Sequence, residues 1–203
     1  MKRRVLTGLL LGSALTAFGQ VGELALSMGA ALLRNPNLGS AAGTTDTGAA
    51  ATFNAIAKAD FRFALRFTVN NKKFFGHEGG YAYNHAKLAF DTTPAQEVGM
   101  PIHQGFYNFL AYATPEGSKV RPFGTGGAHF STFYPPGASV FSGNGVTKFG
   151  LNYGGGIKVK VSEVWLVRMD VRDYFQGKPD LGLQNVKGWL HLWEASAGLG
   201  FTF

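Results

Sequence analysis

Apolar and polar residues alternate along most of this chain, as they do in β-strands that have one apolar face. In the clearest stretch, 146–161, Phe149 and Leu151 alternate with Lys148 and Asn152. The alternation recurs strongly in 22–34, 56–70, 163–175 and 189–203, and more weakly in 74–90, 103–114 and 119–133. The sequence therefore predicts eight strands. For 74–90 and 103–114 it leaves open which residues lie on which face of the strand.

The segments between these strands alternate in length. In chain order they run long, short, long, short, long, short and long, at 35–52, 71–73, 91–102, 115–118, 134–145, 162 and 176–188. Outer-membrane barrels have short periplasmic turns and long external loops, so that alternate connections lie on the same side. We therefore expect an all-β fold, an eight-stranded antiparallel up-and-down transmembrane β-barrel, and we expect it to be a monomer.

The polar faces of the expected strands combine glycines with charges of both signs. In a soluble sheet these charges would face water, whereas in a narrow barrel they could pair across the interior. The interior interpretation is favoured because it agrees with the alternating connections. It predicts a charge network in the lumen made of Glu23, Lys58, Asp60, Arg62, Arg66, Arg121, Lys158, Arg168, Asp170, Arg172 and Glu194.

The first residues have the features of a secretory signal peptide. Lys2, Arg3 and Arg4 precede an apolar stretch from 5 to 15, and small residues stand before a cleavage point after Gly19. We expect 1–19 to direct Sec export and to be removed, which leaves 20–203 as one domain. Without the three cations of the leader, 16 of the 19 basic residues remain, against 12 acidic residues. This excess of positive charge is too small to indicate nucleic-acid binding. The chain has no cysteine, which excludes disulfides and thiolate metal sites.

The last eight residues, 196–203, resemble the C-terminal targeting signal of outer-membrane barrels. Ser196 and Gly198 occupy its polar and glycine positions, while Phe201 and Phe203 occupy its two apolar or aromatic positions. The resemblance implies that the barrel-assembly machinery reads this strand during insertion.

The chain from 21 to 203 resembles the small OmpA-like and OmpX-like outer-membrane β-barrel domains. The stretches 120–124, 152–158 and 168–174 carry the resemblance best, and they are strand patterns rather than catalytic motifs. The resemblance implies a location in the outer membrane, contact with its lipid and lipopolysaccharide, and no cofactor. It also implies a barrel without the periplasmic peptidoglycan-binding domain of full-length OmpA.

An enzymatic alternative rests on His129 and Ser131, which are two residues apart and so share one strand face. A histidine base beside a serine nucleophile is a hydrolase arrangement, and the lipid A deacylase group has a similar His-x-Ser pair. The flanking residues 132–134 do not match that group, and no acidic residue lies between Glu116 and Glu163. The remaining histidines have no paired metal-ligand spacing. We therefore expect neither enzymatic activity nor a metal.

An eight-stranded barrel has an interior just wide enough to be filled by side chains. This geometry argues against a general porin. The sequence thus predicts an integral outer-membrane protein with a structural or surface-interaction role. A lipid-modifying enzyme and a narrow ion channel remain as alternatives.

Overall fold

The computed structural model describes residues 21–45, 47–71, 73–92 and 94–203. Ten strands in these residues form one antiparallel sheet. They are β1 (Val21–Arg34), β2 (Asn37–Thr44), β3 (Ala50–Asn71), β4 (Phe75–Phe90), β5 (Gln96–Gly99), β6 (Ile102–Tyr112), β7 (Val120–Phe133), β8 (Val146–Lys160), β9 (Trp165–Gly177) and β10 (Trp189–Thr202). No helix in the described ranges is both long and apolar enough to cross a bilayer.

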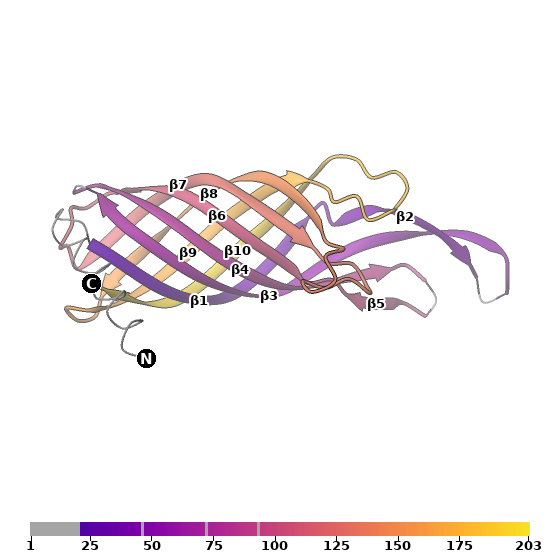
Figure 1. Cartoon of the computed structure of the whole chain (residues 1–203), viewed down its shortest axis with the longest axis horizontal. Coiled ribbons are helices and arrows are strands. Elements are labelled where there is room, and N and C mark those ends of the chain that lie inside the picture. The colour runs from indigo at the N-terminus through magenta and orange to yellow at the C-terminus, as the bar shows by residue number, and fades with distance from the viewer. Residues whose placement is uncertain (1–20, 46, 72, 93) are drawn as a thin grey trace.

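The sheet closes on itself. β1 pairs with β10 on one side and with β3 on the other, and a further pairing joins β3 to β4. The described residues thus form a ring of eight strands in the order β1-β3-β4-β6-β7-β8-β9-β10, with β2 and β5 outside it (Figure 1). The predicted eight-stranded antiparallel barrel is confirmed.

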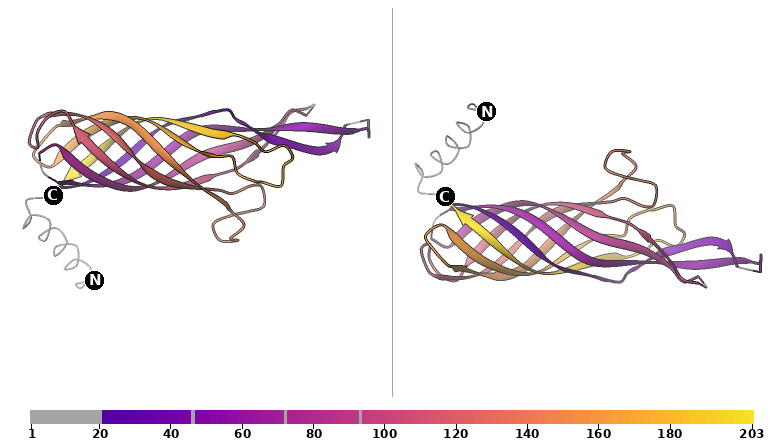
Figure 2. Two further views of the ribbon diagram at one scale, coloured as in Figure 1. Left: turned by 90° about the horizontal axis from the view of Figure 1, so that it is seen from above. Right: turned by 90° about the horizontal axis from the view of Figure 1, so that it is seen from below.

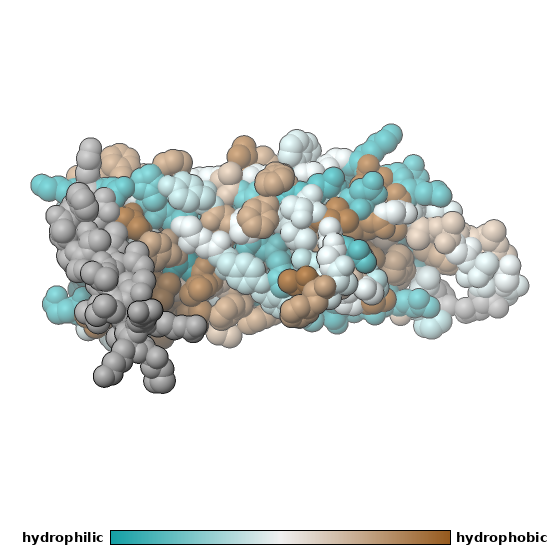
Figure 3. Space-filling view, viewed as in Figure 1, coloured by the Kyte–Doolittle hydropathy of each residue, from teal (hydrophilic) through white to brown (hydrophobic). Residues whose placement is uncertain are grey.

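Side chains point alternately into and out of the barrel. On β10, Leu190 and Leu192 are buried while Trp189 and Leu199 are about 60% exposed. The outward side chains of β10 are therefore mainly apolar, and Figure 3 shows apolar side chains spread along one face of the wall. The even residues of β4 and β6 point inward, which decides the facing that the sequence left open.

A β-bulge in β3 changes which residues point inward. The register with β4 shifts between Ala59 and Arg62. An extra residue in a strand reverses the inward or outward direction of every side chain on one side of the bulge. Arg62 is therefore buried, whereas Lys58 and Asp60 lie on the exposed face. The prediction that Lys58 and Asp60 belong to the interior was wrong for this reason.

The two ends of the barrel differ. The short turns, Val21 and Phe203 lie at one end, which we call the turn end (Figure 2). At the other, the hairpin end, the β2–β3 and β4–β5 hairpins project beyond the ring. The predicted loops 35–52 and 91–102 thus contain the strands β2 and β5. Because β3 and β4 remain paired as far as Ala55 and Phe90, β2-β3-β4-β5 form one external sheet.

Candidate functional site: the barrel interior

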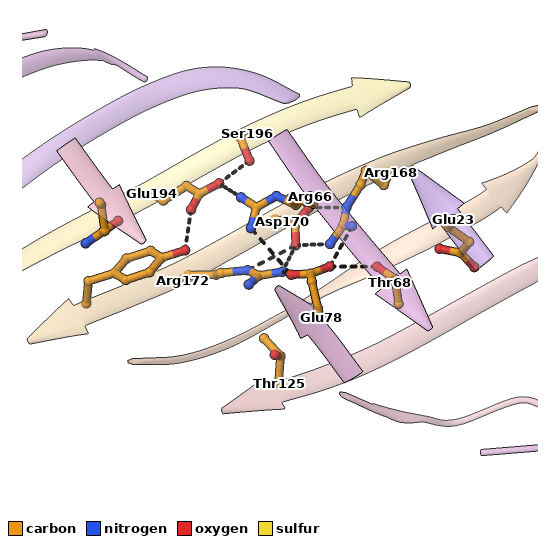
Figure 4. A network of polar contacts seen from close by, with 12 residues as sticks. Glu23, Arg66, Thr68, Glu78, Thr125, Arg168, Asp170, Arg172, Glu194 and Ser196 are labelled. Atoms are coloured by element: carbon orange, nitrogen blue, oxygen red, sulfur yellow. Dashed lines mark hydrogen bonds and ion pairs between the residues drawn. The ribbon is translucent and has the colours of Figure 1, made fainter. Parts of the chain in front are cut away.

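The middle of the barrel interior holds a dense cluster of charges (Figure 4). It comes from β3, β4, β9 and β10, whose inward positions converge there. Within the described residues, four guanidinium groups face three carboxylates, and all seven side chains are fully buried. This charge cluster consists of Arg62, Arg66, Arg168, Arg172, Glu78, Asp170 and Glu194.

Glu78 links the two arginines of β9. Arg168 donates from Nη1 to its Oε2 and Arg172 donates from Nη2 to its Oε1, both at 2.8 Å. The Thr68 hydroxyl donates to Oε2 at 3.1 Å, and Arg66 Nη1 lies 3.6 Å from Oε1. One buried carboxylate is thus shared by three arginines.

Glu78 was not among the residues predicted for the interior, although Arg66, Arg168 and Arg172 were. Tyrosine, histidine and lysine on the outward positions of β4 hid the alternation of this strand. The small residues Gly76, Gly80 and Ala82 share the face of Glu78. They are the signal that could have identified it as inward.

Asp170 lies between the two arginines of its own strand. It accepts from Arg168 Nε at 2.8 Å and from Arg172 Nη2 at 2.7 Å. Residues two apart on a strand share a face, so the run Arg168-Met169-Asp170-Val171-Arg172 builds this contact locally. The other two residues of the run, Met169 and Val171, are exposed on the outer face.

Glu194 holds the two arginines of β3. Arg62 Nε lies 3.0 Å from its Oε2, and Arg66 Nη2 contacts its Oε1. The Tyr174 hydroxyl also donates to Oε2, at 3.0 Å. Burying charges is costly unless each is paired and hydrogen-bonded. Each carboxylate of the charge cluster meets this condition through at least two arginines.

Further polar groups continue the cluster in both directions. Toward the turn end, Lys158 pairs with Glu23 and donates to the Tyr112 hydroxyl at 2.9 Å. Arg121, also predicted as an interior residue, lies 2.9 Å from Glu116. The hollow beside these groups has a volume of about 10 Å³, which is about the space of one water molecule.

Toward the hairpin end, amide side chains follow the charge cluster. Arg62 donates to Asn84 at 2.7 Å and to Gln104 at 2.8 Å. Beyond them the interior is filled by an apolar layer of buried side chains that includes Leu38, Leu88, Met100, Ile102, Phe133, Leu190 and Leu192. The described interior is therefore packed with side chains from one end to the other.

His129 and Ser131 lie inside the barrel rather than on its outer surface. His129 Nε2 is 2.9 Å from Gln176 Oε1, and Ser131 accepts from Gln104 at 3.0 Å. Both residues are at least 97% buried. In the described ranges, no group of three or more His, Asp or Glu side chains is arranged to hold a metal ion.

Lys58, which the sequence placed in the interior, has its partner outside the barrel. Its Nζ lies 2.6 Å from Glu97, and Lys87 lies 3.3 Å from the same carboxylate. Hydrogen bonds from Lys58 and then Lys87 lower the pKa of Glu97 below its ordinary value. This surface ion pair joins β3, β4 and β5 in the external sheet.

The C-terminal strand lies beside the N-terminal one. The backbone of Phe203 exchanges hydrogen bonds of 2.9 and 3.0 Å with Gly22, and its ring stacks on Phe201. Ser196 points inward and donates to Glu194, and Gly198 faces Ser27 across the strand pair. The role of these residues in insertion stays a prediction. The signal peptide predicted at 1–19 lies outside the described residues.

The arrangement of the strands is shared with solved structures. The chain is similar to the outer membrane protein OprG from Pseudomonas aeruginosa, with a TM-score of 0.58 and 16% identity over 90% of this chain and 96% of that one. Neisserial surface protein A gives 0.57 and 14% over 91% and 97%. The N-terminal β-barrel domain of OprF from Pseudomonas aeruginosa gives 0.53 and 12%, again over 91% and 97%.

This chain has the fold of the small outer-membrane β-barrels. No protein-family model and no curated protein matches it. At these identities the solved structures establish the barrel fold and not a specific role. In an outer-membrane barrel, the short turns are periplasmic and the long connections are external.

Proposed function

We propose that this protein is an integral outer-membrane barrel whose filled interior supports an external sheet, in a structural or surface-interaction role. The packed interior carries the proposal, because a route for solutes would have to pass both the apolar layer and the charge cluster. The packing supports an anchoring role over passive transport.

The external sheet is the part of the barrel suited to meet a partner. The sheet formed by β2-β3-β4-β5 ends on two edge strands, whose outer backbone groups are not paired within it. Such edges can accept an added strand from another chain. The 178–188 segment bonds to Ser40 on β2 through Gln184, at 2.8 and 2.9 Å. The part of β2 that this bridge leaves uncovered, 41–44, offers an edge of small residues.

Display at the cell surface can be tested with two epitope tags. A tag inserted after Gly48, at the exposed tip of the β2–β3 hairpin, should bind antibody on intact cells. A matched tag after Gly117, in the exposed turn between β6 and β7, should bind only after the outer membrane is permeabilised. Equal labelling of both tags on intact cells would contradict the proposed orientation.

Conductance distinguishes an anchor from a channel. Reconstituted in planar bilayers, the protein should show no steady conductance steps. Thinning the apolar layer with Leu190→Gly and Leu192→Gly tests whether this layer contributes to the block. Regular steps from the unaltered protein would favour the narrow ion channel instead.

A further inference from the structure

The outer wall carries a cationic and aromatic surface near the hairpin end. We call it the rim patch, and it consists of Arg34, Lys178, Lys187, Trp189, His191 and Trp193. β1 and β10 place Arg34 and His191 opposite each other, and the backbones of Lys178 and Gly188 meet at 3.3 Å. Two adjoining hollows of about 280 and 370 Å³ lie there, and Asn35 lines both.

The cations of the rim patch are available to a ligand. Within the described residues, no carboxylate lies within 4.0 Å of the side-chain nitrogens of Arg34, Lys178 or Lys187. Lys178 donates only to a backbone carbonyl, that of Asn37, at 2.5 Å. The rim therefore gathers positive charge here, whereas Lys58 and Lys87 elsewhere on the rim share a carboxylate.

One acidic residue, Asp173, lines the smaller hollow, and one of its two carboxylate oxygens is already engaged. Its Oδ2 lies 2.9 Å from His191 Nδ1 and accepts from the Tyr153 hydroxyl at 3.2 Å. Asp173 is 95% buried beneath these neighbours. It fixes the imidazole of His191 in place and leaves the exposed surface of the rim patch to the cations. Asp180, in the following segment, accepts from the backbone of Gly182.

Apolar side chains lie directly below the cations on the outer face. Leu32 precedes Arg34 by two residues, shares its face and is 65% exposed. Trp193 pairs with Leu32 across β1 and β10, and the Arg34 guanidinium lies 5.6 Å from its ring centre. Tryptophan and arginine side by side are typical of the level at which lipid headgroups meet hydrocarbon.

We propose that the rim patch binds the phosphorylated headgroup of a lipid in the outer leaflet. Phosphate would lie among Arg34, Lys178 and Lys187, while acyl chains would extend over Trp193 and Leu32. A free anion would contact only the cations of this surface. A water-soluble partner could not contact the apolar side chains Trp193 and Leu32 that lie below Arg34. The assignment rests on the proposed outer-membrane location.

The test uses the full chain refolded in phosphatidylcholine nanodiscs. Bis-phosphorylated lipid A and the same lipid with its phosphates removed are titrated separately, and bound lipid is measured by native mass spectrometry. Each cation near an anionic lipid contributes about fivefold to affinity. The triple variant Arg34→Gln, Lys178→Gln and Lys187→Gln should therefore bind the phosphorylated lipid about a hundredfold more weakly. The control variant, Lys58→Gln with Lys87→Gln, should bind as the unaltered protein does.

Three results would overturn the assignment. The first is equal binding of the phosphorylated and dephosphorylated lipids, and the second is equal weakening in the control variant. The third is inorganic pyrophosphate that binds as tightly as the lipid, which would show an anion site with no preference for lipid. Heat-modifiable gel mobility of every variant shows that the barrel is folded. A loss of lipid binding is then distinguishable from a failure of the barrel proposal.

Discussion

Glu78→Gln should destabilise the barrel more than any neutralisation of a surface carboxylate. The substitution keeps the size of the side chain and removes its charge. In the charge cluster, four arginines would then face two carboxylates instead of three. Arg168 and Arg172 each donate to the Glu78 carboxylate at 2.8 Å, and in the variant they would have one neutral amide oxygen between them.

The expected magnitude follows from burial. Breaking a fully buried ion pair by removing one partner costs about 3–5 kcal/mol, because the remaining charge is left uncompensated. The matched control is Glu97→Gln, which removes a carboxylate that is also shared by two cations but lies at the surface. Exposed pairs contribute about 0–1 kcal/mol, so the control should change stability little.

Stability can be measured by urea unfolding in lipid vesicles, followed by tryptophan fluorescence. Under these conditions Glu78→Gln should lower the free energy of unfolding by about 3–5 kcal/mol, and Glu97→Gln should change it little. A loss below about 1 kcal/mol for Glu78→Gln, or equal losses for the two variants, would refute the reasoning. Either result would mean that water in the interior solvates the arginines that lost their partner.

Two further predictions concern glycine and the chain end. A side chain at Gly127 would meet the carbonyl oxygen of Tyr107 and the backbone of Asn108, whereas one at Gly79 would meet nothing within 4 Å. In the same assay Gly127→Ala should therefore lower the free energy of unfolding by about 1–3 kcal/mol, whereas Gly79→Ala should leave it nearly unchanged. Similar losses for the two variants would argue against the close approach of the strands at Gly127. Deleting Phe203 should lower the amount of protein in the outer-membrane fraction, while Phe203→Leu, which keeps an apolar terminus, should not. Unchanged yield after the deletion would count against an insertion signal.

Much of the barrel is predictable because a strand reports its two faces directly in the sequence. The alternation in β8, β9 and β10 and the alternating connection lengths fix the strand number and the interior position of Arg168, Asp170 and Arg172. The bulge in β3 left no such trace. Lys58 and Asp60 continue the polar alternation toward Arg62 without a break, so a reversal of facing between them is invisible in the pattern.

The external strands were missed for a different reason. Apart from the buried Leu38, β2 consists of small and polar residues. They show no alternation, because this part of the strand crosses no boundary between lipid and interior. Its extended conformation is set by pairing with β3. The rim patch likewise depends on strand register. Arg34 and His191 are far apart in sequence and meet only because β1 and β10 close the ring.

That closure has a consequence for how the protein folds. Arg66 and Glu194 are 128 residues apart in the chain, Lys158 and Glu23 are 135 apart, and Glu78 and Arg168 are 90 apart. These pairs cannot form within a local hairpin, and an open sheet would break them. Contacts of such long sequence separation slow folding. Because the long-range pairs of the cluster break as soon as the ring opens, we expect unfolding to be all-or-none and slow. The folded barrel would then persist for kinetic as well as thermodynamic reasons.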